Sequence, residues 1–135
     1  MTDLEAAVAF FVGLGLEIEG RMPISGDFLD TVTGLHGAST QIVMLRPPGG
    51  GTSLELSCFT RPTAVTDGAV VPVHHVGLRS AAFEVDDLDA VVSWAAAQGY
   101  GLVGGIGAYE GIWRMAYVSG PDGIIVAIAE RTDRA

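Results

Sequence analysis

The stretch VDDLDAVVSWAAAQGYGLVG, residues 85–104, decides the fold, because the chain carries a second version of it at its start. That version is MTDLEAAVAFFVGLGLEIEG, residues 1–20. Aligning the two stretches gives the matched pairs Asp3 and Asp87, Leu4 and Leu88, Ala6 and Ala90, Val8 and Val92, Gly15 and Gly99, and Gly20 and Gly104. A constant offset over this length indicates an internal repeat, so the chain consists of two related modules.

Each of the two stretches has the apolar period of an α-helix that lies on a sheet. The stripes are Leu4, Ala7, Val8 and Phe11 in the first module, and Leu88, Val91, Val92 and Ala95 in the second. Asp3 and Asp87 stand where a helix N-cap belongs, and Gly15 and Gly99 where a helix ends. The sequence therefore predicts one amphipathic helix near the start of each module.

After each helix the apolar period changes to that of strands. The first module continues with residues 16–22, 39–46 and 52–59, the second with residues 99–105, 112–119 and 123–130. An insertion in the first module, PISGDFLDTVTGLHGA, is predicted to be a loop with a short helix near Phe28 to Leu35. This insertion changes the offset between the two modules after their helices, so Glu55 corresponds to Ala127 in the closing strands.

The second module also has a strand before its helix, within VGLRSAAFEV, residues 76–85. The first module has only Met1 and Thr2 in that place. We therefore predict an α+β protein with two βαβββ modules, residues 1–60 and 76–135, joined by a linker at 61–75 and together forming one domain. The first module lacks its N-terminal strand, so its sheet is one strand short or is completed by a neighbouring chain.

Composition excludes several classes of protein. The formal net charge is −9 and the seven basic residues, all arginine, are not clustered, which argues against a nucleic-acid partner. No apolar run reaches the ~20 residues of a membrane span, and the acidic start is unlike a signal peptide. A single cysteine excludes an internal disulfide. We expect a cytoplasmic protein without a membrane or nucleic-acid partner.

Several stretches together resemble a known family. Beside the repeat and the LRSAAFEVDDLDAVV stretch, these are SLELSCF and above all YEGIWRMAYVSGPDGIIVAIAE, which is similar to the closing hairpin of many glyoxalase-like proteins. The chain resembles the vicinal oxygen chelate superfamily, which comprises glyoxalases, bleomycin resistance proteins and ring-cleaving dioxygenases. The resemblance implies a homodimer that encloses a small molecule in a cup of curved sheet.

The resemblance also implies positions for a divalent metal, usually a His and a Glu from each module. Glu55 matches the carboxylate of the first module, whose His would stand on the missing strand. In the second module Ser80 and Ala127 occupy the ligand positions. Glu55 is then the one remaining candidate ligand, so we expect a branch with degenerate ligands, no cofactor and no metal. A divalent metal would require that the natural protein contains the missing strand.

The remaining candidate site residues lie on two predicted strands. Glu55 alternates with Leu54 and Leu56, so it points into the cup as a possible acid/base, or else pairs with Arg46 or Arg114. Trp113, Met115 and Tyr117 share one face of their strand, with Arg114 on the other. That face is either a wall for an aromatic ligand or ordinary core. The full set of candidate ligand-binding residues is Ser80, Tyr109, Trp113, Arg114, Met115 and Tyr117.

Two functions follow from these observations. The first is binding of an apolar or aromatic small molecule in a metal-free cup, as in bleomycin resistance proteins. The alternative is a lyase, isomerase or dioxygenase of the same superfamily that uses Glu55 as acid/base, with or without a metal. The sequence does not decide between them.

Overall fold

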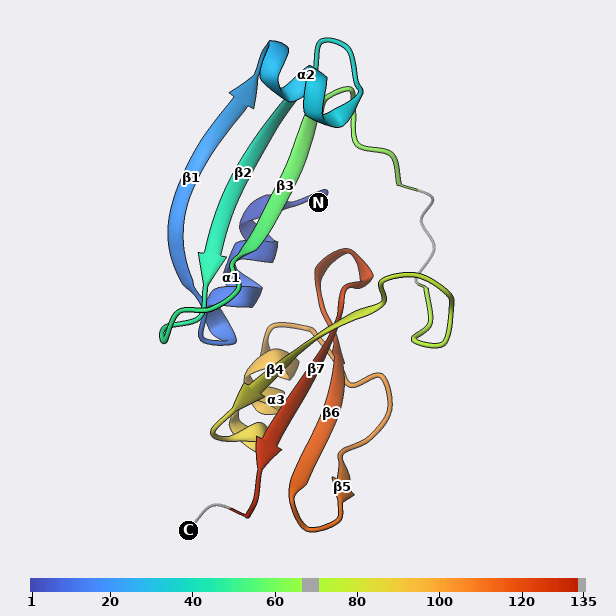
Figure 1. The fold of residues 1–135 in the computed structure, drawn as a ribbon. Helices are drawn as coiled ribbons and strands as arrows, with labels where there is room; N and C mark the ends of the chain where they lie inside the picture. Colours follow the sequence, from blue (N-terminus) through green and yellow to red (C-terminus); the bar gives the residue numbers. More distant parts are fainter. Residues whose placement is uncertain (67–70, 134–135) are drawn as a thin grey trace. The chain divides into compact units, whose positions relative to one another are not determined.

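A computed structural model describes residues 1–66 and 71–133, and it divides the chain into two compact units, Met1–Ala69 and Val70–Ala135 (Figure 1). The first unit contains α1 (Leu4–Gly13), β1 (Glu17–Ser25), α2 (Asp27–Thr33), β2 (Ser39–Arg46) and β3 (Leu54–Arg61). The second contains β4 (Ser80–Val85), α3 (Leu88–Ala97), β5 (Gly107–Tyr109), β6 (Trp113–Ser119), the short 3₁₀ helix η1 (Pro121–Gly123) and β7 (Ile125–Arg131).

The two repeated helices begin and end as the repeat predicts. The Asp3 side chain accepts a hydrogen bond from the Ala6 backbone N–H at 3.0 Å, and Asp87 accepts one from Ala90 at 3.0 Å. These bonds satisfy backbone donors that have no partner within the helix. Just beyond each helix, Gly15 and Gly99 adopt φ values of +108° and +89°, which favour glycine over residues with a Cβ.

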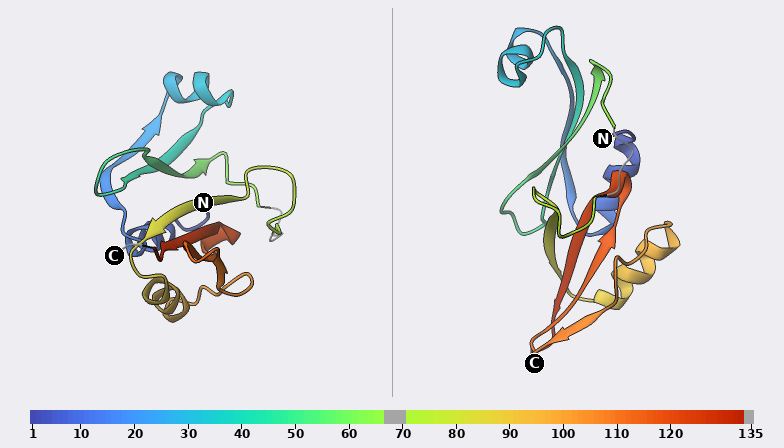
Figure 2. Two further views of the ribbon diagram at one scale, coloured as in Figure 1. Left: turned by 60° about the horizontal axis from the view of Figure 1, so that its bottom comes forward. Right: turned by 90° about the vertical axis from the view of Figure 1, so that its right-hand side faces the viewer.

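The first unit has an antiparallel sheet in the order β1-β2-β3. The helix α1 covers one face of this sheet, as the right-hand view of Figure 2 shows. Val43, Leu45 and Leu56 are buried, and Arg21, the register partner of Val43, pairs with Glu5 of α1. The same face of β2 and β3 therefore forms the hydrophobic core beneath α1.

The second unit has a four-stranded sheet in the order β4-β7-β6-β5. The pair β4·β7 is parallel, and the other two pairs are antiparallel. The helix α3 lies on one face of this sheet (Figure 2). Leu88 of α3 and Val126 and Ile128 of β7 are fully buried, so the central strand supplies much of the core.

This architecture confirms the predicted α+β fold, including the first unit's missing strand within the residues that the structure describes. It also confirms the short inserted helix, which is α2. One strand differs from the prediction: residues 99–105 form only an isolated bridge, Leu102 to Val118, and the edge strand is β5 instead. Glycines at 99, 101, 104 and 105 weaken a strand there. The module and linker boundaries stay predictions, and linker residues 67–70 lie outside the described residues.

Candidate functional site

The candidate site is the face of the second sheet that does not bear α3, which we call the open face. Arg114 of β6 donates two hydrogen bonds of 3.0 Å to Asp89 of α3, so its side chain points to the helix. Ala116 and Val118, which share its side of the strand, are buried. By alternation Trp113, Met115 and Tyr117 lie on the open face, where Met115 is 38% and Tyr117 39% exposed. These three side chains are therefore not part of the core beneath α3. Their role as a wall for a ligand stays a prediction.

The strand register shows which residues accompany this row. Tyr109 on β5 is the partner of Trp113, and Ala82, Ala127 and Tyr117 form one row across three strands. Ser80 lies two residues before Ala82 and so has the same orientation. Five of the six predicted ligand-binding residues thus share the open face, namely Ser80, Tyr109, Trp113, Met115 and Tyr117.

The sixth predicted residue, Arg114, lies on the opposite face and holds α3. The Asp89 carboxylate hydrogen bonds to the guanidinium, which lowers the pKa of Asp89 and raises that of Arg114. Glu130 of β7 lies 3.8 Å from the same guanidinium and accepts a hydrogen bond of 2.7 Å from the Leu88 backbone N–H. Arg114 therefore positions the first turn of α3, away from the aromatic row.

Sequence reasoning missed Arg131 as a member of the open face. Its guanidinium carbon lies 5.6 Å from the centre of the Trp113 ring, within the range of a cation–π contact. Asp133 accepts hydrogen bonds from the Arg131 side chain at 2.6 and 3.1 Å, which raises the pKa of Arg131. The alternation of Ala127, Ala129 and Arg131 along the closing strand is the signal that predicts this position.

Two further observations complete the chemistry of the open face. Glu84 of β4 is the register partner of Ala129, which places a carboxylate on this face. Small side chains on β7 lie beside large ones on β6, with Ala127 opposite Tyr117 and Ala129 opposite Met115. The face therefore presents a thioether and aromatic rings with hydroxyl, guanidinium and carboxylate groups near them.

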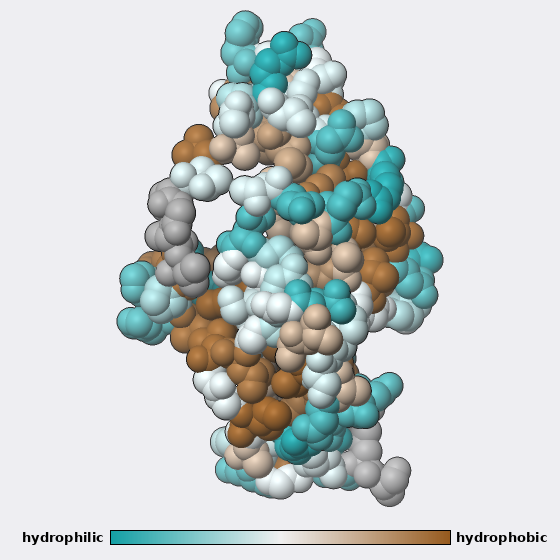
Figure 3. All heavy atoms as spheres, turned by 180° about the vertical axis from the view of Figure 1, so that it is seen from behind, coloured by the Kyte–Doolittle hydropathy of each residue, from teal (hydrophilic) through white to brown (hydrophobic). Residues whose placement is uncertain are grey.

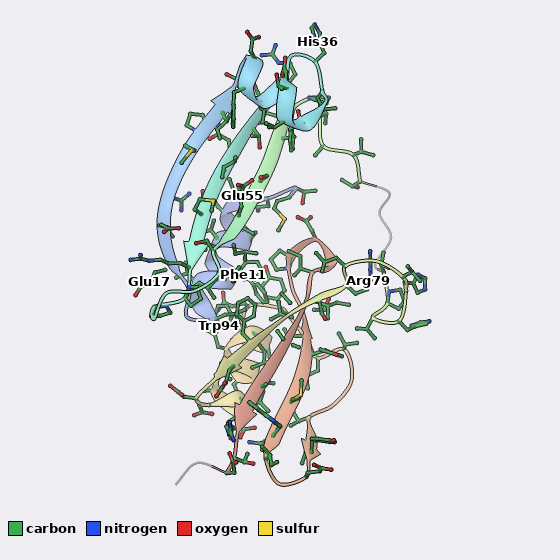
Figure 4. The ribbon with its side chains drawn as sticks, in the orientation of Figure 1. Phe11, Glu17, His36, Glu55, Arg79 and Trp94 are labelled. Carbon is green, nitrogen blue, oxygen red and sulfur yellow. The ribbon has the colours of Figure 1, made fainter. Side chains whose placement is uncertain are left out.

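Glu55 lies in the first unit, on β3 (Figure 4). Its register partner is Met44, and Leu56, the next residue, is buried beneath α1, so Glu55 points to the face without α1. The side chain is exposed and accepts a hydrogen bond of 3.1 Å from the Ser57 hydroxyl. Among the described residues it forms no ion pair with an arginine. Glu55 is thus an exposed carboxylate whose hydrogen-bond donor is the Ser57 hydroxyl.

The residues at the positions of the family's metal ligands do not fit a divalent cation in the second unit. Ser80 and Ala127 share the open face, but they carry neither an imidazole nor a carboxylate. Within residues 1–66 and 71–133, no group of three or more His, Cys, Asp and Glu side chains could hold a metal ion. We therefore derive no chemistry through a metal from these residues.

Exposed apolar side chains also occur away from the open face. Figure 3 shows the molecule from behind, with hydrophobic surface in more than one place. Leu102, Val103 and Ile106, between α3 and β5, are exposed apolar residues of the second unit. In the first unit Phe28 of α2 is 69% exposed. An apolar ligand therefore has several exposed surfaces to which it can bind. A binding experiment needs a control variant outside the open face.

Comparisons with known proteins show the family and the fold of the chain. Residues 1–117 match the family model of the glyoxalase/bleomycin resistance protein/dioxygenase superfamily. A glyoxalase family protein from Bacillus cereus is 35% identical, with a TM-score of 0.93 over 97% of this chain and 88% of that one. No curated protein matches.

More distant structures share the fold alone. A glyoxalase/dioxygenase from Nostoc punctiforme is 20% identical, with a TM-score of 0.66 over 97% of this chain and 85% of that one. The trypanothione-dependent glyoxalase I of Leishmania major is 20% identical, with a TM-score of 0.63 over 96% of this chain and 80% of that one. With the family model matching most of its length, the chain belongs to the glyoxalase/bleomycin resistance protein/dioxygenase superfamily.

Proposed function

We propose that this protein binds an apolar or aromatic small molecule on the open face of its second unit, without a metal. The observation that carries the proposal is the row Trp113, Met115 and Tyr117, which lies on the face opposite α3 while its neighbours in sequence are buried or bound to α3. Large apolar side chains grouped at a surface are typical of ligand sites, because covering them removes apolar area from water.

The composition of the row favours an aromatic ligand. Tyr109, Trp113 and Tyr117 offer ring edges and faces, and the Met115 sulfur interacts favourably with aromatic rings. Ala129, opposite Met115, is small and half-buried, so a flat molecule can approach the sheet there. Hydroxyl groups of the tyrosines and the guanidinium of Arg131 supply polar contacts for substituents on such a ligand.

The side chains at the metal-ligand positions of the second unit support the metal-free part of the proposal. Because Ser80 and Ala127 stand at the ligand positions of the second unit, the open face offers no imidazole there and its nearest carboxylate is that of Glu84. We expect binding to be unchanged after dialysis against a chelator. A ligand that binds only after addition of zinc, nickel, manganese or iron would contradict this part.

Tryptophan fluorescence tests the binding proposal directly. The two tryptophans are Trp94 and Trp113, so the Trp94→Phe variant makes Trp113 the single reporter. Titration with a panel of aromatic natural products and dyes should change its emission. In that background Tyr117→Ala should weaken binding by about 3- to 10-fold, the worth of one aromatic contact.

The matched control is Phe28→Ala, which removes an exposed aromatic ring from the first unit. This change should leave affinity unaltered. If Phe28→Ala weakens binding as much as Tyr117→Ala does, the ligand is adsorbing to apolar surface in general. If no compound in the panel changes Trp113 emission, the proposal fails.

A second candidate is lyase, isomerase or dioxygenase chemistry with Glu55 as acid/base. The observation in its favour is that Glu55 is exposed on an open sheet face, next to a hydroxyl and without an arginine partner among the described residues. Turnover of a superfamily substrate that Glu55→Gln abolishes and Ser57→Ala retains would establish it. Turnover that both variants retain would exclude Glu55 as the acid/base.

The predicted homodimer and cytoplasmic location are part of the same proposal. No helix among the described residues is long and apolar enough to cross a membrane. Sedimentation velocity of the full chain tests the dimer, and fractionation of the source cells tests the location. A monomer across the micromolar range would contradict the first of these.

A further inference from the structure

The strand register orders the open face into rows of side chains that run across the sheet. Three successive rows cross β6 at Trp113, Met115 and Tyr117. The row through Met115, which we call the middle row, crosses all four strands and consists of Gly107, Met115, Ala129 and Glu84. Rows on one face of a sheet lie two residues, or about 7 Å, apart along a strand. An aromatic side chain therefore stands on each side of the middle row.

The middle row is lower than the rows beside it. On the strands to either side of Met115, Gly107 has no side chain and Ala129 has only a methyl group. Among the described residues, no heavy atom outside Gly107 and its two chain neighbours lies within 4 Å of the place that a Cβ at this glycine would take. The Met115 side chain is unbranched and adapts to what packs against it. A flat ring system therefore has room to lie along the middle row, across the strands.

The row through Trp113 is already covered at its β7 end. Arg131 is the register partner of Trp113, and its guanidinium carbon lies 5.6 Å from the centre of the indole ring. Asp133 holds this guanidinium in place, because it accepts hydrogen bonds of 2.6 Å from Nε and 3.1 Å from Nη2. A ligand that leaves this contact intact reaches the indole from the middle row. The geometry therefore directs an aromatic ring to the space over Met115.

The β4 end of the middle row is negatively charged. Glu84 is exposed there, and its carboxylate attracts the Arg131 guanidinium electrostatically. That guanidinium is also bound by Asp133, so the three side chains together carry one more negative than positive charge. Arg114 and Glu130 bond to α3 and do not face this end of the row. A positively charged group on a ligand is therefore favoured beside Glu84, and an anionic group is disfavoured.

We propose that the open face selects flat aromatic compounds with a basic group at one end, and that Glu84 is the residue that recognises this group. The inference rests on the proposed function and adds to it a class of ligand and a specificity-determining residue. Glu84 lies two strand spacings from Met115, which is about 10 Å. The basic group should therefore be at about this distance from the centre of a ring that lies over Met115.

Three matched probes separate binding of the ring from recognition of the basic group. They are a naphthalene that carries a butylamine chain, its neutral N-acetyl derivative, and the matching carboxylic acid. The extended chain is long enough to place the ammonium beside Glu84 with the ring over Met115. NMR follows the indole N–H signal of Trp113 in the Trp94→Phe variant. The amine should bind about 3- to 5-fold more tightly than the N-acetyl probe, the range of an exposed ion pair, and the acid most weakly.

Two carboxylate variants test the residue. Glu84→Gln should bring the ratio of the amine and N-acetyl affinities close to one, because it removes the charge that distinguishes the probes. The matched control is Glu110→Gln, which removes an exposed carboxylate from the turn between β5 and β6. It changes the net charge of the chain equally and should leave the ratio as it was. Ala129→Leu places a large side chain in the middle row and should weaken binding of all three probes.

The outcomes distinguish this inference from the binding proposal on which it rests. Equal affinity of the amine and the N-acetyl probe, with both bound, would overturn the inference and leave the binding proposal standing. The inference also fails if Glu110→Gln lowers the ratio as much as Glu84→Gln does, since net charge alone would then explain the preference. Full binding by Ala129→Leu would show that the ligand does not lie along the middle row. If none of the three probes shifts the Trp113 signal, both proposals fail.

Discussion

The two units of this protein share their helix design and differ at one sheet edge. In both, an aspartate caps the helix, a glycine with positive φ ends it, and one face of the sheet is buried beneath it. Only the second unit has a strand before the helix in the described structure. The comparison teaches that one helix design serves both an all-antiparallel sheet and a mixed sheet. In the second unit the Leu88 N–H at the start of α3 also donates a hydrogen bond to Glu130 of β7.

The largest effect should come from the cores that both units need. Leu45 of β2 and Ile128 of β7 are 0% exposed. Leu45→Ala and Ile128→Ala should each lower the free energy of unfolding by about 2–5 kcal/mol, because each leaves a cavity beneath a helix. Denaturant unfolding measures the loss by circular dichroism, and tryptophan fluorescence reports the second unit, which holds Trp94 and Trp113. A much smaller loss in one unit would mean that its sheet is not packed as described.

Adding the strand that the first unit lacks should have the next largest effect. The sequence of residues 79–84 placed directly before Met1 would supply five residues in the register of β4, those of 80–84, with Met1 in the place of Val85. Cross-strand pairs are worth about 0.2–1 kcal/mol each, so we expect a gain of roughly 1–3 kcal/mol. A scrambled extension of the same composition is the control. Equal stability of the two extended chains would show that the edge does not accept this strand.

Removing the helix caps should cost less and should separate the two helices. Asp3→Ala and Asp87→Ala should each destabilise by about 1 kcal/mol. α3 should lose less than α1, because Glu130 still accepts from the Leu88 N–H, whereas the corresponding residue in the first unit is Cys58. Adding Glu130→Ala, which removes this acceptor, to Asp87→Ala should make the losses of the two helices similar. Amide exchange in the first turns measures both.

The smallest effect should be a loss of stability in acid, shared by both units. Backbone N–H groups of Ala38 and Gly37 hydrogen bond to Asp30 and lower the pKa of that carboxyl, and Arg114 does the same for Asp89. A lowered pKa in the folded state gives stability that is present above the ordinary value of 3.8 and is lost as the pH falls through the folded pKa. Asp30→Asn and Asp89→Asn should flatten the stability profile below pH 3.8 and leave its shape near neutrality. An unchanged acid limb would contradict this.

The fold could be predicted from the sequence because its determinants are local and repeated. Asp3, Gly15 and the stripe between them define one helix, and the second copy confirms the pattern. The error at residues 99–105 arose because apolar residues between glycines match a strand pattern. Whether such a segment pairs depends on its neighbour, and here Gly107–Tyr109 pairs with β6 over three residues instead.

The candidate site could be predicted only in part. Alternation placed Trp113, Met115 and Tyr117 together and Arg114 apart, but only Arg114 binding to Asp89 shows which set faces the helix. Glu84 could not be assigned to the open face without the register of β4 against β7. Sequence spacing alone does not give that register, because the strands that meet in the sheet are far apart in the chain.

The parallel pair β4·β7 has a consequence for how the chain folds. The first sheet is made of neighbouring strands, β1 with β2 and β2 with β3, so its chain closures are short. In the second sheet β4 pairs with β7, and α3, β5 and β6 lie between these two strands in sequence. The pairing of β4 therefore closes a long loop. Closing a longer loop costs more entropy before any contact is gained, and mean sequence separation of contacts slows folding. The second unit should therefore be the slower of the two to form.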